Sequence, residues 1–407
     1  MMQEPKLFLC LPVLNESANI PSLFEGISKQ SYQKFELIVC VNQPEAWWND
    51  PEKRNICLDN QKSIALIQKE NRFPITLIDK SSKENAWQGK QKGVGWARKL
   101  VMDKASELGQ PSDLIVSIDA DSEYPADYLA SVVSLFQNKP NCVGLANPYY
   151  HRLTNDDDAN RAILRYEIYM RNYAINMLLI DNPYQFSALG SALATPISVY
   201  NRVGGMTPKA AGEDFYFLQK LRKFGDLENW NSTKVFPAAR FSDRVNFGTG
   251  PAMIKGQAGD WSSYPIYPFQ LFKKIKATYD LFPELFKSDV NTPMTHFLQN
   301  QLKKEVLWNS LRSNYKTQDQ FVKACRILVD GLRILQFLKS ESINNKDDQS
   351  KHLTENLLYF STLDSEFSEQ LKRDAGAIDL SSFSTLKKIR ETLSNFEYSL
   401  RKSKSKP

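Results

Sequence analysis

The sequence has few cysteines, no enrichment in glycine or proline, and no long hydrophobic run. Its five cysteines among 407 residues are odd in number and form no C-x-x-C pair, which argues against a disulfide framework and against a zinc site. With 17 glycines and 20 prolines, the chain is neither collagen-like nor of low complexity. No run reaches the roughly 18 apolar residues of a membrane-spanning helix, and the apolar run after Glu4 and Pro5 is too short for a signal peptide. We therefore expect a globular, cytoplasmic protein.

The excess positive charge of the chain is confined to its C-terminal third. Residues 1–268 contain 29 basic and 29 acidic side chains, whereas residues 269–407 contain 23 and 17. The final RKSKSKP contributes four of the basic ones. Such a run indicates a solvated tail or, alternatively, peripheral contact with an anionic surface such as the inner face of a membrane. No basic stripe with interleaved aromatic residues accompanies it, so we expect no nucleic-acid partner.

Short apolar runs alternate with helical patterns through the first half of the chain. The runs that predict strands are KLFLCLPV, FELIVCV, PITLID, DLIVSID and NCVGLANP. Between them, helices are expected at about 20–29, from about 61, at 88–108 and at 126–137. Strands of this length separated by helices indicate βαβ units around a mostly parallel sheet that is covered on both faces. This half therefore belongs to the α/β class.

The pattern becomes mostly helical in the second half. We expect a helix over about 156–179, a strand of small residues in SALGSALATP, and a helix in GEDFYFLQKLRKFG that Gly225 closes. Residues 237–268 lack periodicity and predict a long loop wrapped over a site. Further helices are expected near 269–280, 294–313, 317–340, 351–374 and 383–402. We therefore place a boundary between an α/β domain of residues 1–268 and an all-helical domain of residues 269–407.

Two aspartates follow the apolar strand LIVSI. Asp119 and Asp121 are separated by Ala120, so at the carboxyl end of a parallel strand both carboxylates face the crevice in which such sheets bind ligands. Two carboxylate ligands suit Mg²⁺ or Mn²⁺ bridging a diphosphate, because the metal neutralises phosphate charge and stabilises a leaving group. The alternative is that the pair only caps a helix and a turn.

A second motif, LPVLNES, follows the first predicted strand. Together with the paired aspartates it resembles the family 2 glycosyltransferases, which transfer sugars from nucleotide sugars and have the GT-A fold; the resemblance covers about residues 5–250. The motif LPVLNES is similar to the opening P-x-x-N-E of that family. This similarity implies that Pro12, Asn15 and Glu16 line the nucleoside pocket. Ordinary helix capping by Asn15 or Ser17 explains the same turn.

The second and third predicted strands extend the resemblance. FELIVCVNQ matches the family's second strand, but Asn42 stands where the family commonly has an aspartate-rich turn to the base. This difference leaves the base open, because an amide both donates and accepts hydrogen bonds. Asp79, after the third strand, fits the family's next nucleotide contact.

The segment GKQKGVGWARK is similar to the family's glycine-rich stretch. The resemblance implies that Lys92 and Arg98, and alternatively Lys90, offer positive charge to a diphosphate. The alternative interpretation is that this segment only marks the start of a helix. It lacks the third glycine of the dinucleotide-binding fingerprint and no strand directly precedes it, which argues against a dehydrogenase.

The longest match to the family is ALGSALATPISVYNRVGGMTPKAAGEDFYF. An inverting transfer needs a carboxylate that takes the proton of the acceptor hydroxyl. The family assigns this role to the aspartate of the E-D pair, which implies Asp214 as the base with Glu213 in support. Capping of the following helix by two acidic residues is the alternative interpretation.

The segment FSDRVNFGTG lies where some relatives supply a further metal ligand, often a histidine. The chain has no histidine there, so Asp243 is the candidate third ligand, with water as the alternative because Mg²⁺ usually retains several waters. Further along, Gln257 and Trp261 fall in a pattern like the Q-x-x-R-W of processive synthases, but its arginine is replaced by Asp260. We therefore do not expect chain polymerisation.

These observations predict a GT-A glycosyltransferase with a Rossmann-like, mostly parallel sheet flanked by helices and an added all-helical C-terminal domain. It would move one sugar from a nucleoside diphosphate sugar (UDP or GDP) to an unidentified acceptor hydroxyl with inversion, using Mn²⁺ or Mg²⁺. Two alternatives remain: a sugar nucleotidyltransferase, and a non-catalytic nucleotide-binding scaffold whose helical third is the working interface.

Overall fold

The computed structural model describes residues 4–209, 211–241, 249–262, 264–342 and 349–405. The chain divides into two compact units, each assembled from separate stretches of sequence. Unit 1 comprises residues 1–163, 186–259 and 401–407, and unit 2 comprises residues 164–185 and 260–400. The domain boundary that we expect near residue 268 stays a prediction.

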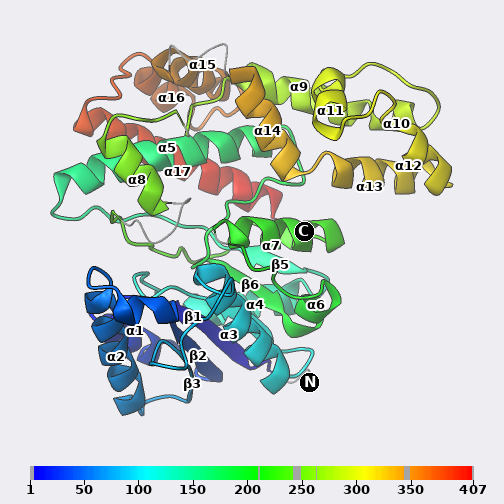
Figure 1. The fold of residues 1–407 in the computed structure, drawn as a ribbon. Helices are drawn as coiled ribbons and strands as arrows, with labels where there is room; N and C mark the ends of the chain where they lie inside the picture. Colours follow the sequence, from blue (N-terminus) through cyan, green and yellow to red (C-terminus); the bar gives the residue numbers. More distant parts are fainter. Residues whose placement is uncertain (1–3, 210, 242–248, 263, 343–348, 406–407) are drawn as a thin grey trace. The chain divides into compact units, whose positions relative to one another are not determined.

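Unit 1 is built on one sheet (Figure 1). Its strand order is β3-β2-β1-β4-β6-β5-β7. The strands are β1 (Leu7–Val13), β2 (Phe35–Asn42), β3 (Ile75–Lys80), β4 (Leu114–Ser117), β5 (Gly144–Ala146), β6 (Leu193–Pro196) and β7 (Leu227–Glu228). β6 runs antiparallel to β4 and β5, and the remaining pairs are parallel. The mostly parallel α/β sheet predicted from the sequence is confirmed.

The central strands are buried on both faces of the sheet. In β1 every residue from Leu7 to Leu11 is buried, and successive side chains point to opposite faces. Helices supply the cover: α2 packs on β2 and β3, α3 on β1 and β2, and α7 on β5 and β7. The helices of unit 1 are α1 (Ile20–Ser28), η1 (Glu45–Asn49), α2 (Arg54–Lys69), α3 (Val94–Leu108), α4 (Tyr128–Asn138), α6 (Ile197–Arg202), α7 (Glu213–Phe224) and α8 (Thr249–Gln257). A continuous apolar run is therefore the sequence signature of a strand covered on both sides.

Helix α8 contradicts the expectation of a long loop over residues 237–268. Gly250 and Pro251 lie in its first turn. Proline is tolerated there because the backbone N–H groups of the first turn have no partner within the helix. Ala252 and Met253 are buried, so tertiary packing stabilises a helix that the local sequence pattern does not predict.

The described part of unit 2 is helical, as predicted for the C-terminal region. Its first helix, α5 (Asp157–Leu179), begins in unit 1 and continues into unit 2. The others are α9 (Phe269–Asp280), α10 (Phe282–Leu285), α11 (Thr295–Leu302), α12 (Asn309–Asn314), α13 (Gln318–Leu328), α14 (Gly331–Ser342), α15 (Gln349–Ser361), α16 (Ser368–Ala375) and α17 (Phe383–Lys404). The sequence predicts single helices near 294–313, 317–340 and 351–374, but each of them is two helices in the structure. These are α11 and α12, α13 and α14, and α15 and α16, respectively.

A buried ion-pair network ties α5 to α17 inside unit 2. Arg171 pairs with Glu167 on its own helix and, at 2.7 Å, with Glu397 on α17. Arg390 of α17 lies 3.2 Å from the second oxygen of Glu167. All four side chains are almost completely buried, so removing one partner leaves an uncompensated charge in the interior.

The basic residues near the C-terminus are not all solvated. Arg401 is buried and donates to the Ser187 hydroxyl, whereas Lys402 and Lys404 are exposed. Across the described residues, no helix combines the length and the apolar character needed to cross a bilayer.

Candidate active site

Three acidic residues follow the carboxyl ends of two adjacent parallel strands. β1 pairs with β4, with Cys10 opposite Ser117. Glu16 follows β1, and Asp119 and Asp121 follow β4, so all three lie at the edge where α/β sheets bind their ligands. The location predicted from the sequence for the paired aspartates therefore agrees with the sheet topology.

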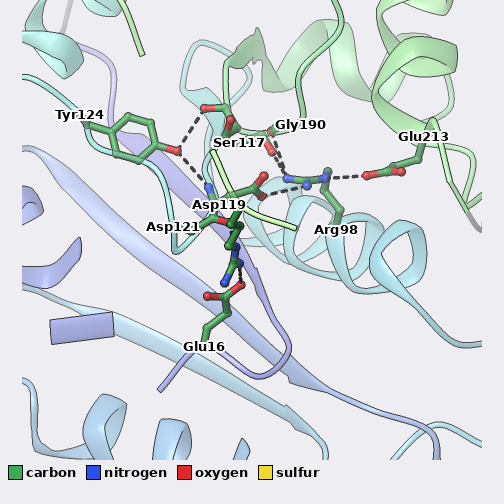
Figure 2. A network of polar contacts seen from close by, with 10 residues as sticks. Glu16, Arg98, Ser117, Asp119, Asp121, Tyr124, Gly190 and Glu213 are labelled. Carbon is green, nitrogen blue, oxygen red and sulfur yellow. Dashed lines mark hydrogen bonds and ion pairs between the residues drawn. The ribbon is translucent and has the colours of Figure 1, made fainter. Parts of the chain in front are cut away.

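Arg98 of α3 connects this edge to the start of α7. Its Nη2 lies 2.9 Å from Asp119 Oδ1, and its Nε lies 3.1 Å from Glu213 Oε1. Its Nη1 donates to the Ser117 hydroxyl at 2.6 Å and to the Gly190 carbonyl at 3.1 Å (Figure 2). One buried guanidinium thus brings together the acidic stretches near positions 120 and 213, which are distant in sequence.

Two glycines allow the chain to approach this arginine and its helix closely. A Cβ on Gly190 would lie 2.5 Å from Arg98 Nη2, and a Cβ on Gly95 would lie 2.1 Å from the Lys209 carbonyl oxygen. Both distances are far below a normal contact, so a larger residue would displace the Arg98 side chain at position 190 and the Lys209 backbone at position 95. The segment that leads into α7 therefore lies directly against the N-terminal turn of α3.

Asp214 is the second residue of α7 and is half-buried. Gly212, with φ of 72°, takes the left-handed conformation just before the helix, and Asp214 Oδ1 accepts the backbone N–H of Phe215 at 2.7 Å. Burial, the largest cause, and the negative charge of Glu213 raise the pKa of Asp214, whereas Arg98 lowers it, and the net result is a pKa of about 7. A carboxyl with a pKa near neutrality is suited to general base catalysis.

Asp121 and Glu16 share a second arginine, Arg240. Arg240 Nη2 lies 2.6 Å from Asp121 Oδ2 and also forms an ion pair with Glu16 Oε1. The backbone near Arg240 is held by the chain next to Asp121, because Phe236 and Glu123 exchange backbone hydrogen bonds of 3.0 and 2.9 Å. The chain that leads to Arg240 is therefore held beside the segment that carries Asp121.

Tyr124 fixes the backbone of the paired aspartates. Its hydroxyl accepts the backbone N–H of Asp119 at 2.9 Å and donates to the Ser191 carbonyl at 3.1 Å. Burial raises the pKa of Tyr124 well above its usual value, and the charge of Asp119 adds to this. The hydroxyl consequently stays protonated and serves as a structural link.

Sequence reasoning did not identify Tyr124, Ser117, Gly190 or Arg240. For Tyr124 a signal exists, since it lies three residues after Asp121 in the segment that follows β4. Ser117 ends the predicted strand β4, but no local pattern indicates that it or Gly190 accepts from Arg98, and the position of Arg240 depends on the pairing of Phe236.

The residues expected at the nucleoside are engaged within the protein. The Asn42 amide donates to the Val13 carbonyl at 2.9 Å and accepts from Trp87 Nε1 at 3.2 Å. Asn15 has a positive φ of 58°, and its backbone N–H donates to Asn60 Oδ1 at 2.9 Å. These contacts shape the turn after β1, and the roles of both residues toward a nucleoside stay predictions.

The remaining predicted binding residues lie on different features. Pro12 is inside β1 opposite Cys40, and Lys92 is exposed just before α3. Asp79 Oδ1 accepts the backbone N–H groups of Ser81 and Ser82 at 2.8 and 2.9 Å. Burial raises the pKa of Asp79, but hydrogen bonds from the side chains and backbones of Ser82 and Ser81 outweigh it and hold the pKa below its usual value.

The donor set around Asp121 fits a divalent cation bound together with phosphates. No group of three or more histidine, cysteine or acidic side chains able to hold a metal occurs among the described residues, and Asp243 lies outside them. Mg²⁺, however, is usually bound through one or two carboxylates plus substrate phosphates and waters. Asp121 and Glu16 both contact one nitrogen atom, so their carboxylates are close enough to share a cation, whereas Asp119 is held by Arg98.

No protein-family model matches the chain, and no curated protein matches its sequence. Among solved structures, it is similar to S. aureus TarS 1–349 in complex with UDP-GlcNAc, at 11% identity over 98% of this chain and 92% of that one, with a TM-score of 0.42. It is also similar to the mannosyltransferase PcManGT from Pyrobaculum calidifontis in complex with GDP-Man and Mn²⁺, at 14% identity over 87% and 85% of the two chains, with a TM-score of 0.40.

Proposed function

We propose that the protein is a glycosyltransferase that moves a single sugar from a nucleoside diphosphate sugar, with UDP or GDP as the nucleotide, to an acceptor hydroxyl. One observation carries the proposal: Arg98 links Asp119 to Glu213, beside a half-buried Asp214 whose pKa is raised to about 7. Donor-binding carboxylates and a general base in one site are what a direct glycosyl transfer requires. The order of motifs that resembles family 2 supports the same reaction.

In this proposal Asp214 acts as the base of an inverting reaction. The acceptor oxygen attacks the anomeric carbon, the bond from that carbon to the diphosphate oxygen breaks, and the acceptor proton passes to a carboxylate oxygen of Asp214. Glu213 is held in an ion pair by Arg98, so Asp214 is the carboxylate assigned as the base. Arg98 is thus a positioning residue, since it orients Asp119 and Glu213 and moderates the pKa of Asp214.

A divalent cation, Mn²⁺ or Mg²⁺, is implied by the resemblance to family 2. Asp121 and Glu16 would hold it in this chain, with Asp119 kept by Arg98, and when bound it would neutralise charge on the diphosphate. The diphosphate is the leaving group, so positive charge near it stabilises the transition state.

Calorimetric titration with UDP and GDP, with and without Mn²⁺, tests the donor site. Hydrolysis of candidate UDP- and GDP-sugars, measured by the nucleotide released, then tests turnover. We expect binding by the wild type and loss of turnover in Asp214→Asn with nucleotide binding retained. Asp226→Asn is the matched control, because this carboxylate has 95% of its side chain exposed.

Two results would contradict the transferase. Retention of near wild-type turnover by both Asp214→Asn and Asp121→Asn would remove the proposed base and donor site. Nucleotide binding without any turnover would instead favour the non-catalytic scaffold.

A further inference from the structure

Arg240 lies in the position of a cation between two carboxylates. A single nitrogen atom, Nη2, contacts both Asp121 Oδ2, at 2.6 Å, and Glu16 Oε1. Two carboxylates directed at one positive atom are also the arrangement that a bound metal ion requires. Arg240 and a divalent cation therefore compete for the same pair of oxygens.

The Arg240 side chain is more exposed than that of Arg98. About a third of the Arg240 side chain, 33%, is exposed, against 3% for Arg98. Each nitrogen of the Arg98 guanidinium is already within hydrogen-bond distance of an oxygen, whereas Arg240 Nε has no hydrogen-bond partner in the described structure. Arg240 is thus the arginine of this site that retains the capacity to bind a ligand.

Charge balance shows why that capacity matters. Glu16, Asp119, Asp121 and Glu213 outnumber the two arginines with which they pair, and a diphosphate brings further negative charge. The negative charges of the carboxylates and of the diphosphate repel one another strongly in a partly buried site. The diphosphate consequently needs a cation that faces it, and a planar guanidinium matches phosphate oxygens in a bidentate geometry.

We propose that Arg240 is an exchangeable counter-ion of the donor site: it bridges Glu16 and Asp121 in the free protein and turns to the diphosphate when the donor arrives. The proposal rests on the proposed function for the identity of the ligand. It assigns Arg240 a donor-binding role that leaves Glu16 and Asp121 available for a divalent cation only when the diphosphate is present. Metal and nucleoside diphosphate therefore bind cooperatively, because each relieves the cost that the other would meet alone.

Arg240→Gln tests both parts of the proposal, because it should raise the affinity for Mn²⁺ and lower the affinity for the nucleoside diphosphate. Without the guanidinium, Mn²⁺ binding in the absence of nucleotide should tighten, measured by the electron paramagnetic resonance signal of free Mn²⁺. UDP or GDP binding in EDTA, measured by calorimetry, should weaken by about tenfold or more because a charge-assisted contact is lost. UMP or GMP, with one phosphate fewer, should lose less affinity, and Arg240→Lys should recover part of it.

Arg72→Gln is the matched control. Arg72 also bridges two carboxylates, Glu25 and Glu70, each at 2.7 Å, but it lies after α2, away from the ends of β1 and β4. Its substitution should change neither affinity. Thermal unfolding of every variant checks that it is folded, and the charge-retaining Arg240→Lys provides the test if Arg240→Gln is not.

The outcomes distinguish this inference from the proposed function. If the wild type binds UDP or GDP and Arg240→Gln binds it equally well, or if the variant binds Mn²⁺ no more tightly than the wild type, the role of Arg240 is overturned and the transferase stands. If the wild type binds neither nucleotide with or without Mn²⁺, the proposed function falls and the role of Arg240 falls with it.

Discussion

Arg98 and Glu213 form an ion pair that is almost excluded from water, with 3% and 6% of their side chains exposed and a separation of 3.1 Å. The pair joins α3 to the first turn of α7, so it determines where the neighbouring Asp214 lies. Because the same guanidinium holds Asp119, one side chain links the segment after β4 to the start of α7. Under the proposed function, stability and activity therefore depend on the same arginine.

Replacing Arg98 should destabilise the protein strongly. Arg98→Met leaves the Glu213 carboxylate buried without its partner, and breaking a buried pair in this way costs about 3–5 kcal/mol. Denaturant unfolding measures the change. Arg222→Met is the control, since its partner Asp226 is exposed and surface pairs contribute at most about 1 kcal/mol; equal losses in the two variants would contradict the account.

Turnover should depend on the ionisation of Asp214. Its pKa is raised to about 7 by burial and by Glu213, so the carboxyl is protonated and unable to accept a proton at pH 5 to 6. We expect the rate of transfer to rise through a limb near pH 7, and Asp214→Asn to lower it about 100- to 10,000-fold. Initial rates across pH check this, and a limb unchanged in shape in Asp214→Asn would assign it to another group.

Asp214 should also make stability depend on pH. Its pKa is raised from 3.8 to about 7 in the folded protein, so the folded state binds a proton more tightly than the unfolded state does. Stability contributed by this group is therefore present below about pH 4 and is lost as pH rises toward 7. Asp214→Asn removes the effect, so relative to the wild type it should be more stable at pH 8 than at pH 4, as measured by unfolding midpoints at both pH values.

The strands and the acidic residues of the site were predictable because each carries a local signal. β1 and β2 are apolar runs, and Asp119 and Asp121 follow such a run directly. Sheet topology then places them at the ligand-binding edge without further information. Arg240 has no comparable signal, because the backbone pairing of Phe236 with Glu123 brings it to that edge.

Helix breaks in unit 2 escaped prediction for a related reason. Apolar periodicity continues across residue 303, where Lys303 takes a left-handed conformation with φ of 53°. Glycine is the residue that usually signals such a conformation. At the next break Asp330 accepts the backbone N–H of Arg333 at 3.1 Å and so begins a new helix. Periodicity reports which face is buried but not whether the backbone is continuous.

Adding one methyl group at Gly190 should disturb the site without changing any charge. The new Cβ would lie 2.5 Å from Arg98 Nη2, so either the guanidinium or the segment before β6 must shift. Overpacking of this kind costs about 1–3 kcal/mol, and the displaced arginine should weaken nucleotide binding and turnover together. Gly26→Ala in α1 is the control, because nothing lies within 4 Å of its added methyl and alanine favours a helix. Unfolding and calorimetry on both variants decide the matter: a Gly190→Ala protein as stable and as active as Gly26→Ala would show that Arg98 does not need the space that glycine leaves.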